Sequence, residues 1–398
     1  MHSVETLAAR PNSLAPHYSR FRVAERLLLS GHSHQAWPDV ARDGLVESFD
    51  DAALAVDEKW QRAEAKAERV RDGFRALLGD PEGEIALAAS THELVVRWLS
   101  ALDLEARPRL VTTAGEFHAI RRQLARLAEC GIEIHREPPD PVETLAERLA
   151  RTTDGRTAAV LVSAVFFETA RVVPGLDRLA TACAHVGVPL LVDAYHALGA
   201  IPFRLAEQGL ESALITGGGY KYLQLGEGNA FLRLPKGLDL RPVVTGWFAE
   251  FGTKSGPKGW DRVDYLAGAG AFGGSTYDPA SHYRAARVFE FFVEQGLTPE
   301  LLRAVSLHQV ERLAARFDAL DLPAPVVTRN RTLSPGARGA FLALESPRAF
   351  ELHQALHARG VATDSRGRYL RIGPAPYLDD GQLDAAIDAL GEAVGALA

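Results

Sequence analysis

The sequence predicts an α/β protein with a mostly parallel, seven-stranded sheet and a smaller α+β unit at its C-terminal end. Between residues 80 and 235, short apolar runs alternate with amphipathic helical stretches. Strands that alternate with helices need crossover connections, and such connections produce parallel pairing. The runs are apolar throughout instead of at every second position, which is typical of strands covered by helices on both faces.

Seven segments are the strand candidates, and helices fit between most of them. The strands are expected at residues 84–90, 109–113, 132–136, 158–165, 188–193, 212–217 and 229–234. The intervening helices are expected at 91–103, 116–129, 142–151 and 175–186. Residues 1–30 predict an irregular arm with one short helix, and residues 39–78 predict a helix because apolar positions recur there at helical spacing.

The last hundred residues follow a different pattern, which predicts the small α+β unit. Strands are expected at 339–346 and 368–373, with helices at 347–359 and 379–397, and two further helices at 284–296 and 299–318 come before them. A chain of 398 residues is long for one core, so about two domains are expected. We predict an N-terminal arm and helix over residues 1–60 that pack on the small domain, a large domain over 61–285 and the small domain over 286–398.

Composition and charge exclude several classes of protein. The formal net charge is −7, and the 44 basic residues are dispersed among 51 acidic ones without a basic stripe, which argues against nucleic-acid binding. The N-terminus lacks the apolar core of a signal peptide, and no apolar run approaches a membrane span, so a cytoplasmic protein is expected. Cys130 and Cys183 lie in apolar, helix-like stretches and are expected to be buried. They show no metal-ligand spacing, and no metal is expected.

Two polar residues follow neighbouring strands of the predicted sheet. Asp193 ends the run VPLLVD, and Lys221 follows the next strand after three glycines at 217–219. Each alone has an ordinary explanation, a helix cap or ion pair for the aspartate and a solvated surface position for the lysine. Ligands of open α/β sheets bind at the carboxyl ends of the strands, however, and pyridoxal 5′-phosphate (PLP) needs a lysine amine and an acid beside its ring nitrogen. The pair therefore predicts PLP held as a Schiff base on Lys221.

Other residues near these strand ends complete the predicted cofactor site. Ser90 and Thr91 precede an amphipathic helix, where hydroxyl and backbone N–H groups can bind a phosphate as well as cap the helix. Phe117 or His118 could stack on the cofactor ring, and Phe117 is favoured. The glycines at 217–219 are expected to let the backbone come close to a ligand.

Four segments resemble the class V aminotransferase superfamily and, within it, kynureninase. They are DAYHALGA (193–200), GGGYKYLQLGEG (217–228), TGWF (245–248) and YLRIGPAPYLDD (369–380). The resemblance covers roughly residues 25–395 and implies the PLP-dependent transferase fold type I. It implies a homodimer with shared active sites and an amino-acid substrate.

The resemblance also assigns roles to residues of this chain. It places the Schiff base on Lys221, the ring acid on Asp193 with His196 as its partner, and a phosphate contact on Tyr220. Ser163 falls on a cofactor-binding serine, and Arg371 on the arginine that binds the substrate carboxylate, for which a planar guanidinium is suited. Trp247 and Asp278 fall in a region that reaches the cofactor across the dimer interface.

The predicted function is a kynureninase-like hydrolase that cleaves the Cβ–Cγ bond of L-kynurenine or a related substrate. An aminotransferase or β-lyase that acts on another amino acid is the alternative. The loop GHSHQAW (31–37) departs from the kynureninase pattern and adds His32 and His34, so Ser33 and His34 are assigned to the substrate pocket. Glu168 stands where the family has a tyrosine. No cysteine follows residue 183, which disfavours a desulfurase, and no DNA-contacting module supports a PLP-binding regulator.

Overall fold

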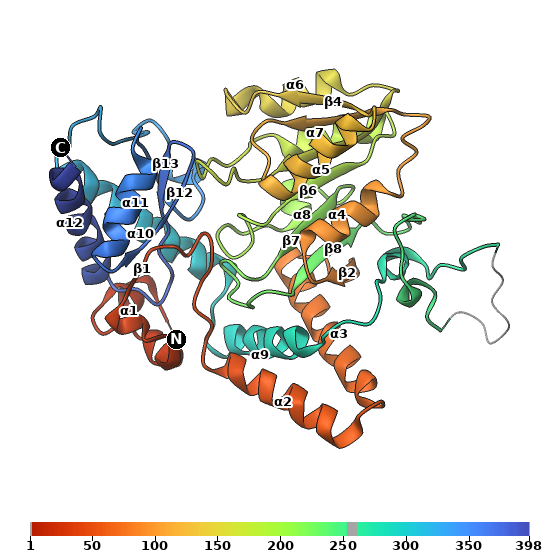
Figure 1. The fold of residues 1–398 in the computed structure, drawn as a ribbon, viewed down its shortest axis with the longest axis horizontal. Coiled ribbons are helices and arrows are strands. Elements are labelled where there is room, and N and C mark those ends of the chain that lie inside the picture. Colours follow the sequence, from red (N-terminus) through yellow and green to blue (C-terminus); the bar gives the residue numbers. More distant parts are fainter. Residues whose placement is uncertain (1, 253–260, 398) are drawn as a thin grey trace.

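The computed structural model describes residues 2–252 and 261–397, and its largest element is a seven-stranded sheet (Figure 1). The strand order is β2-β8-β7-β6-β5-β3-β4, and β8 runs antiparallel to both of its neighbours while the other six strands are mutually parallel. This confirms the predicted mostly parallel α/β sheet. The strands are β2 (Glu84–Ala88), β3 (Arg109–Thr113), β4 (Glu133–Glu137), β5 (Thr157–Ser163), β6 (Leu190–Asp193), β7 (Leu214–Gly218) and β8 (Ala230–Leu234).

Both faces of the sheet are covered, as the continuous apolar runs predict. Along β5, Val160 and Val162 belong to one hydrophobic cluster, while Ala159 and Leu161 belong to a second cluster on the other face. The crossover helices are α4 (Thr91–Leu99), α5 (His118–Glu129), α6 (Leu145–Thr152), α7 (Leu176–His185) and α8 (Leu205–Gln208). A strand covered on both sides is excluded from water except at its ends, so the ends are where side chains can meet a ligand.

The predicted helix over residues 39–78 is divided in two, which corrects that prediction. The chain forms α2 (Val40–Ala55) and α3 (Lys59–Leu78) with a break between them, and both helices pack against α9 (Ala280–Glu294) (Figure 1). Gly44 permits the close approach of α2, because a Cβ there would lie 2.6 Å from the backbone oxygen of Tyr283. The break lets each segment follow α9, a constraint that comes from residues far away in the sequence.

The C-terminal residues form a second, four-stranded antiparallel sheet of order β12-β13-β10-β9. Strand β1 (Leu27–Leu28) of the N-terminal arm pairs with β11, and α1 (Val4–Ala8) packs on α10, so the arm contacts this unit. The three domain boundaries stay predictions.

The elements of the C-terminal unit are β9 (Thr328–Arg329), β10 (Leu342–Glu345), β11 (Val361–Ala362), β12 (Asp364–Arg366), β13 (Tyr369–Ile372), α10 (Pro299–Ala319), α11 (Ala349–Ala358) and α12 (Asp380–Leu397). The 3-10 helices are η1 (Ala15–Phe21), η2 (Val23–Glu25), η3 (Val142–Thr144), η4 (Trp247–Glu250), η5 (Gly268–Phe272) and η6 (Pro335–Ala337).

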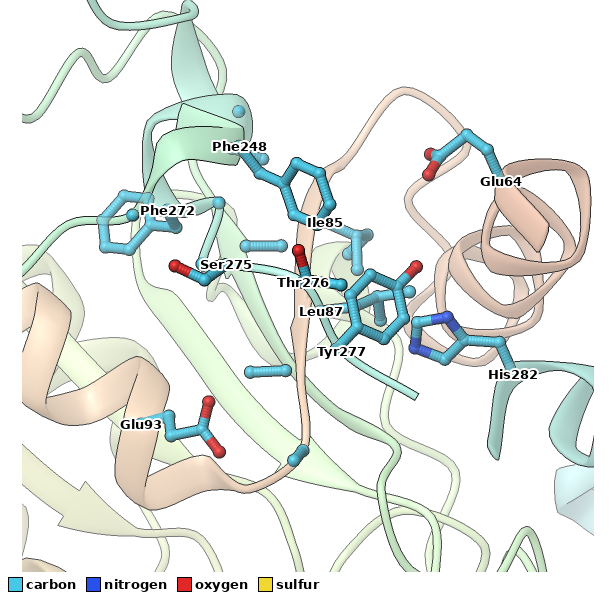
Figure 2. A pocket seen from close by; sticks show the side chains of 18 of the residues that line it. Glu64, Ile85, Leu87, Glu93, Phe248, Phe272, Ser275, Thr276, Tyr277 and His282 are labelled. Atoms are coloured by element: carbon cyan, nitrogen blue, oxygen red, sulfur yellow. The ribbon is translucent and has the colours of Figure 1, made fainter. Parts of the chain in front are cut away.

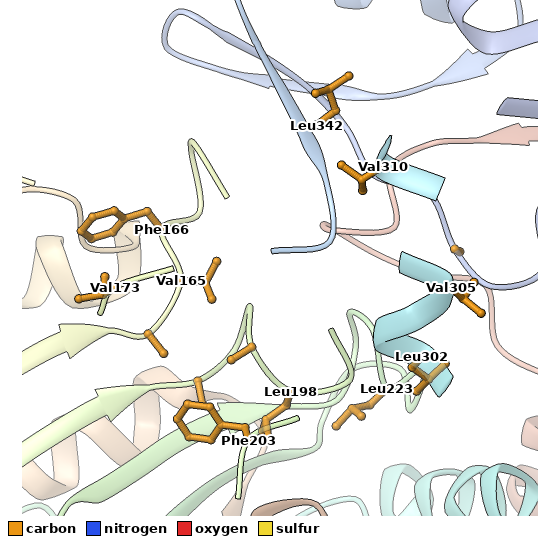
Figure 3. Packing of buried hydrophobic residues seen from close by; sticks show 14 of the residues in the cluster. Val165, Phe166, Val173, Leu198, Phe203, Leu223, Leu302, Val305, Val310 and Leu342 are labelled. Atoms are coloured by element: carbon orange, nitrogen blue, oxygen red, sulfur yellow. The ribbon is translucent and has the colours of Figure 1, made fainter. Parts of the chain in front are cut away.

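Apolar packing joins the two sheets at the carboxyl ends of the large sheet's strands. Figure 3 shows Val165, Leu198 and Leu223 from loops after these strands, together with Leu302 and Leu342 of the C-terminal unit. All belong to one cluster of buried residues. The C-terminal unit therefore covers the strand ends that carry the predicted site.

The two cysteines differ in their surroundings. Cys183 on α7 is buried as expected, whereas Cys130 at the C-terminal end of α5 is exposed, which corrects the expectation that both are core residues. Among the described residues, no helix is long and apolar enough to cross a membrane.

Candidate active site

The carboxyl ends of adjacent strands bring the predicted cofactor residues together. Ser163 is the last residue of β5 and pairs in register with Asp193, the last residue of β6. Lys221 follows β7, which is the next strand in the sheet. Side chains at paired positions of neighbouring strands point to the same face. The order of the strands therefore gathers the serine, the acid and the lysine at one edge.

Lys221 is buried, not a solvated surface lysine. Its side chain is 5% exposed, and Nζ lies 2.8 Å from Nε2 of His196. The amine also lies 5.2 Å from the centre of the Phe117 ring and 4.6 Å from that of Tyr195. Burial lowers the pKa of Lys221 to about 7, although the charge of Asp193 opposes this shift. A substantial fraction of the amine is therefore neutral near pH 7, the form that attacks an aldehyde.

Asp193 and His196 have unused bonding capacity at this site. Asp193 accepts the backbone N–H of Tyr195 at 2.8 Å and so caps a turn instead of a helix. Burial raises its pKa, whereas the Tyr195 hydrogen bond and the charge of Lys221 oppose the rise. When His196 Nε2 accepts from the lysine amine, Nδ1 carries the ring proton, and no described residue accepts it. A buried acid and an orphaned ring nitrogen beside a neutral lysine fit a bound pyridinium ring, so the residues fit PLP.

The three glycines before Lys221 do not have the environment that the sequence suggested. Instead of space for a ligand, a Cβ at 217, 218 or 219 would meet the side chains of Phe231, Tyr195 and Leu225, respectively. The closest approach is 2.4 Å, from the Gly219 Cβ position to Cδ1 of Leu225. These glycines are required by packing around the end of β7.

Arg371 lies on β13 of the C-terminal unit, and its side chain is buried. Its Nε donates to Oδ1 of Asp364 at 2.7 Å, its Nη2 contacts the other oxygen of Asp364, and its Nη1 donates to the backbone carbonyl of Phe167. Asp364 also contacts His32 Nε2 at 2.8 Å. Burial would raise the pKa of Asp364, but the hydrogen bonds from His32 and Arg371 hold it well below its usual range. Three of the five guanidinium donors are thus used, and two can bind a substrate carboxylate.

The loop that departs from the kynureninase pattern lies beside Tyr220. The His34 ring stacks on the Tyr220 ring at 4.9 Å and 21°, and Ser33 Oγ lies 3.3 Å from His34 Nδ1. His34 Nε2 is 3.7 Å from Glu227. His32 differs from its neighbours because it is fully buried, and burial lowers its pKa to about 4. His34 is exposed, whereas His32 holds Asp364. The assignment of Ser33 and His34 to the substrate pocket stays a prediction.

The other predicted cofactor residues lie at or near an open cavity of about 1710 Å³ (Figure 2). Trp247 and Asp278 line it, as do residues that flank Ser90 and Thr91. Ser90 caps α4 by accepting the backbone N–H of Glu93. Lys221 is not among the lining residues. Within one chain, the structure therefore does not bring Trp247 and Asp278 to the lysine.

Two acidic residues of the site were missed by the sequence reasoning. Glu116 follows β3 at the same sheet edge and is 2% exposed; it accepts the backbone N–H of Ser163, and its other carboxyl oxygen lies 2.7 Å from Ser163 Oγ. The search for polar residues after strands could have found it. Asp364 holds Arg371 because their strands pair in register, and no local signal marks that pairing. Among the described residues, no group of three or more His, Cys, Asp or Glu side chains could hold a metal ion.

Comparisons with known proteins find relatives along most of the chain. The model of the kynureninase C-terminal domain matches residues 302–390, which include Arg371. Kynureninase of Pseudomonas fluorescens is 26% identical, over 96% of this chain and 92% of that protein. An uncharacterized aminotransferase of Bacillus subtilis (strain 168), YcbU, is 25% identical, over 86% of this chain and 88% of that protein.

Solved structures share the fold at lower identity. A structure of C-DES with glycine covalently linked to the PLP cofactor has a TM-score of 0.81 at 17% identity, covering 95% of this chain and 98% of that chain. An apo cysteine desulfurase of Thermococcus onnurineus NA1 has a TM-score of 0.78 at 15% identity, covering 100% and 99%. These likenesses establish the fold.

The fold and the buried lysine site define a PLP-dependent protein of fold type I, and its cofactor is PLP. Within this fold type, the chain is a class V aminotransferase-like enzyme whose sequence relatives include an aminotransferase and a kynureninase.

The lowered pKa of Lys221 predicts how covalent uptake of PLP depends on pH. Only the neutral amine attacks the aldehyde, so the uptake rate should rise with pH, reach half its maximum near pH 7 and then level off. Stopped-flow absorption of the apoprotein mixed with PLP measures this rate, and Lys221→Met should show no covalent uptake. A rate that keeps rising up to about pH 10, as for an exposed lysine, would contradict the assigned burial.

Proposed function

We propose that the protein is a kynureninase-like hydrolase that cleaves the Cβ–Cγ bond of L-kynurenine or a related amino acid. The observation that carries this proposal is the kynureninase C-terminal match over residues 302–390, since that segment includes Arg371, whose charge acts on Lys221. The 26% identity to a kynureninase along nearly the whole chain supports it further.

The residues around the cofactor site are suited to proton transfer at the substrate's α-carbon. Bound PLP supplies a ring that accepts the negative charge left at that carbon. Asp193 is the acid that would keep the ring nitrogen protonated, and its burial beside Lys221 limits competition from water. With a pKa near 7, the Lys221 amine can take up and return a proton at neutral pH.

Substrate orientation and the final proton transfers are assigned to side chains around the pocket. The two free donors of Arg371 can bind the α-carboxylate, and the Asp364 pair fixes the plane of the guanidinium. Burial raises the pKa of Tyr220, so its hydroxyl stays protonated and can donate a proton. The balance is one kynurenine and one water giving one anthranilate and one alanine.

An aminotransferase or a β-lyase that acts on another amino acid is the second candidate. The 25% identity to an aminotransferase of Bacillus subtilis favours it, and such an enzyme would use the same lysine, acid and arginine. A persulfide-forming desulfurase is disfavoured because the sequence has no cysteine after residue 183 that could act as the nucleophile.

Product analysis separates the two candidates. Incubation of the PLP-loaded protein with L-kynurenine, and separately with 3-hydroxykynurenine, should release alanine and the corresponding anthranilate in equal amounts, measured by mass spectrometry. Lys221→Ala should release neither above the blank, because the proton-transfer group is lost. An oxo acid formed together with pyridoxamine phosphate would instead establish the aminotransferase. An intact protein with bound PLP and no anthranilate would refute the hydrolase proposal.

We also propose that two copies of the chain form a homodimer with shared active sites. Trp247 is 53% exposed, and its ring lies 5.2 Å from that of Phe251, which is also exposed; a second copy would cover these apolar side chains. Trp247 and Asp278 line a cavity whose lining does not include Lys221 of the same chain. A partner chain could supply them to the lysine site.

Mixed dimers test the sharing of residues. Trp247→Ala and Lys221→Ala should each be inactive, but after subunit exchange about a quarter of the sites should recover, because half of the dimers are mixed and each holds one intact site. Light scattering should show twice the mass of one chain. Absence of recovery in demonstrably mixed dimers, or full activity of Trp247→Ala alone, would contradict shared sites.

A further inference from the structure

Glu116 is a buried carboxyl group that neither the cofactor assignment nor the proposed reaction uses. It lies in the turn between β3 and α5, directly before Phe117, and is 2% exposed. Among the described residues it forms no ion pair, although a buried carboxylate normally has a cationic partner. A glutamine would tie the turn to the sheet equally well, so a structural role alone does not account for an acid at this position.

Both carboxyl oxygens of Glu116 contact Ser163. The backbone N–H of Ser163 donates to Oε1 at 2.9 Å, and Ser163 Oγ lies 2.7 Å from Oε2. Ser163 ends β5 in register with Asp193, and the next residue, Ala164, donates its N–H to the Asp193 carbonyl at 2.8 Å. Glu116, Ser163 and Asp193 therefore form a continuous row across three adjacent strands.

Two carboxyl groups in one buried row do not both ionise easily. Burial raises the pKa of Glu116 to about 8, the hydrogen bonds from Ser163 oppose the rise, and the charge of Asp193 adds to it. Two charged groups influence the pKa values in this row. Asp193 on β6 acts on Glu116, and Lys221 after β7 acts on Asp193. The negative charge is best held by Asp193, beside the lysine, which leaves Glu116 as the neutral member.

We propose that Glu116 is a positioning residue that sets the direction in which the Ser163 hydroxyl donates its proton. When Glu116 is protonated, its Oε2–H donates to Ser163 Oγ, and the serine proton is free to turn toward the bound cofactor. When Glu116 is ionised, the Ser163 hydroxyl donates to its carboxylate and can no longer donate to the cofactor. The inference rests on the PLP site but not on the identity of the substrate.

The structure offers a variant that fixes one of these two states. In Glu116→Gln, the amide oxygen can still accept the Ser163 N–H, while the amide nitrogen donates to Ser163 Oγ, as protonated Glu116 would. This variant should keep the fold and bind the cofactor, but the side chain at position 116 should no longer ionise. Glu129→Gln is the matched control, because Glu129 lies exposed at the other end of α5.

Two spectroscopic titrations test the proposal without any substrate. Infrared difference spectra of the apoprotein should show a protonated carboxyl band that disappears with a midpoint near pH 8 in the wild type and in Glu129→Gln, and that is missing from Glu116→Gln. In the PLP-loaded protein, the difference between the visible spectra of wild type and Glu116→Gln should grow with the same midpoint. In the Ser163→Ala background, that difference should vanish.

Each result decides the proposal. It is overturned if the carboxyl band persists in Glu116→Gln, or if wild type and Glu116→Gln give identical cofactor spectra from pH 6 to pH 10, roughly two units either side of the expected midpoint. It is also overturned if the spectral difference survives in Ser163→Ala, because the effect would then not pass through the serine. A failure of kynurenine cleavage would refute the proposed reaction and leave these spectra unaffected, so the two failures are distinguishable.

Discussion

The burial of the Lys221 amine at the end of β7 is the constraint on which the rest of the site depends. An ammonium ion is costly in this environment, so the lysine can be both buried and reactive near neutral pH. His196 supports the amine from 2.8 Å, and Asp193 limits how far the pKa falls. The apolar strands and the C-terminal unit that covers their ends exclude water, so the amine stays buried with a lowered pKa.

The topology of the sheet explains why these groups are in contact. Strands β3, β5, β6 and β7 lie side by side, so the residues after them, which are far apart in sequence, form one row. The C-terminal unit adds Arg371, whose orientation depends on the pairing of β12 with β13 and on the hydrogen bond that His32 donates to Asp364. The site is thus divided between a row of groups fixed by one sheet and an arginine fixed by another.

Much of this arrangement could be predicted from the sequence, where the signal is local. Most of the seven strands contain a short apolar run, although β4 (EIHRE) does not. Asp193 ends one strand, and Lys221 comes shortly after another. The break between α2 and α3 was missed because no proline or glycine marks residues 56–58; both helices pack against α9, which is distant in the sequence. Strands of two or three residues, such as β9 and β12, are too short to show a period. The partner of Glu116 lies 47 residues away, so their pairing depends on the sheet order.

The most direct test of the central claim is the chemical identification of the lysine that holds PLP. The sequence has six lysines, at positions 59, 66, 221, 236, 254 and 258. Borohydride reduction of the PLP-loaded protein fixes the cofactor on the lysine that carries it, and peptide mass spectrometry then locates the adduct. The account predicts a single modified residue, Lys221, at one equivalent per chain. An adduct on another lysine, or none on Lys221 in protein that binds PLP, would contradict it.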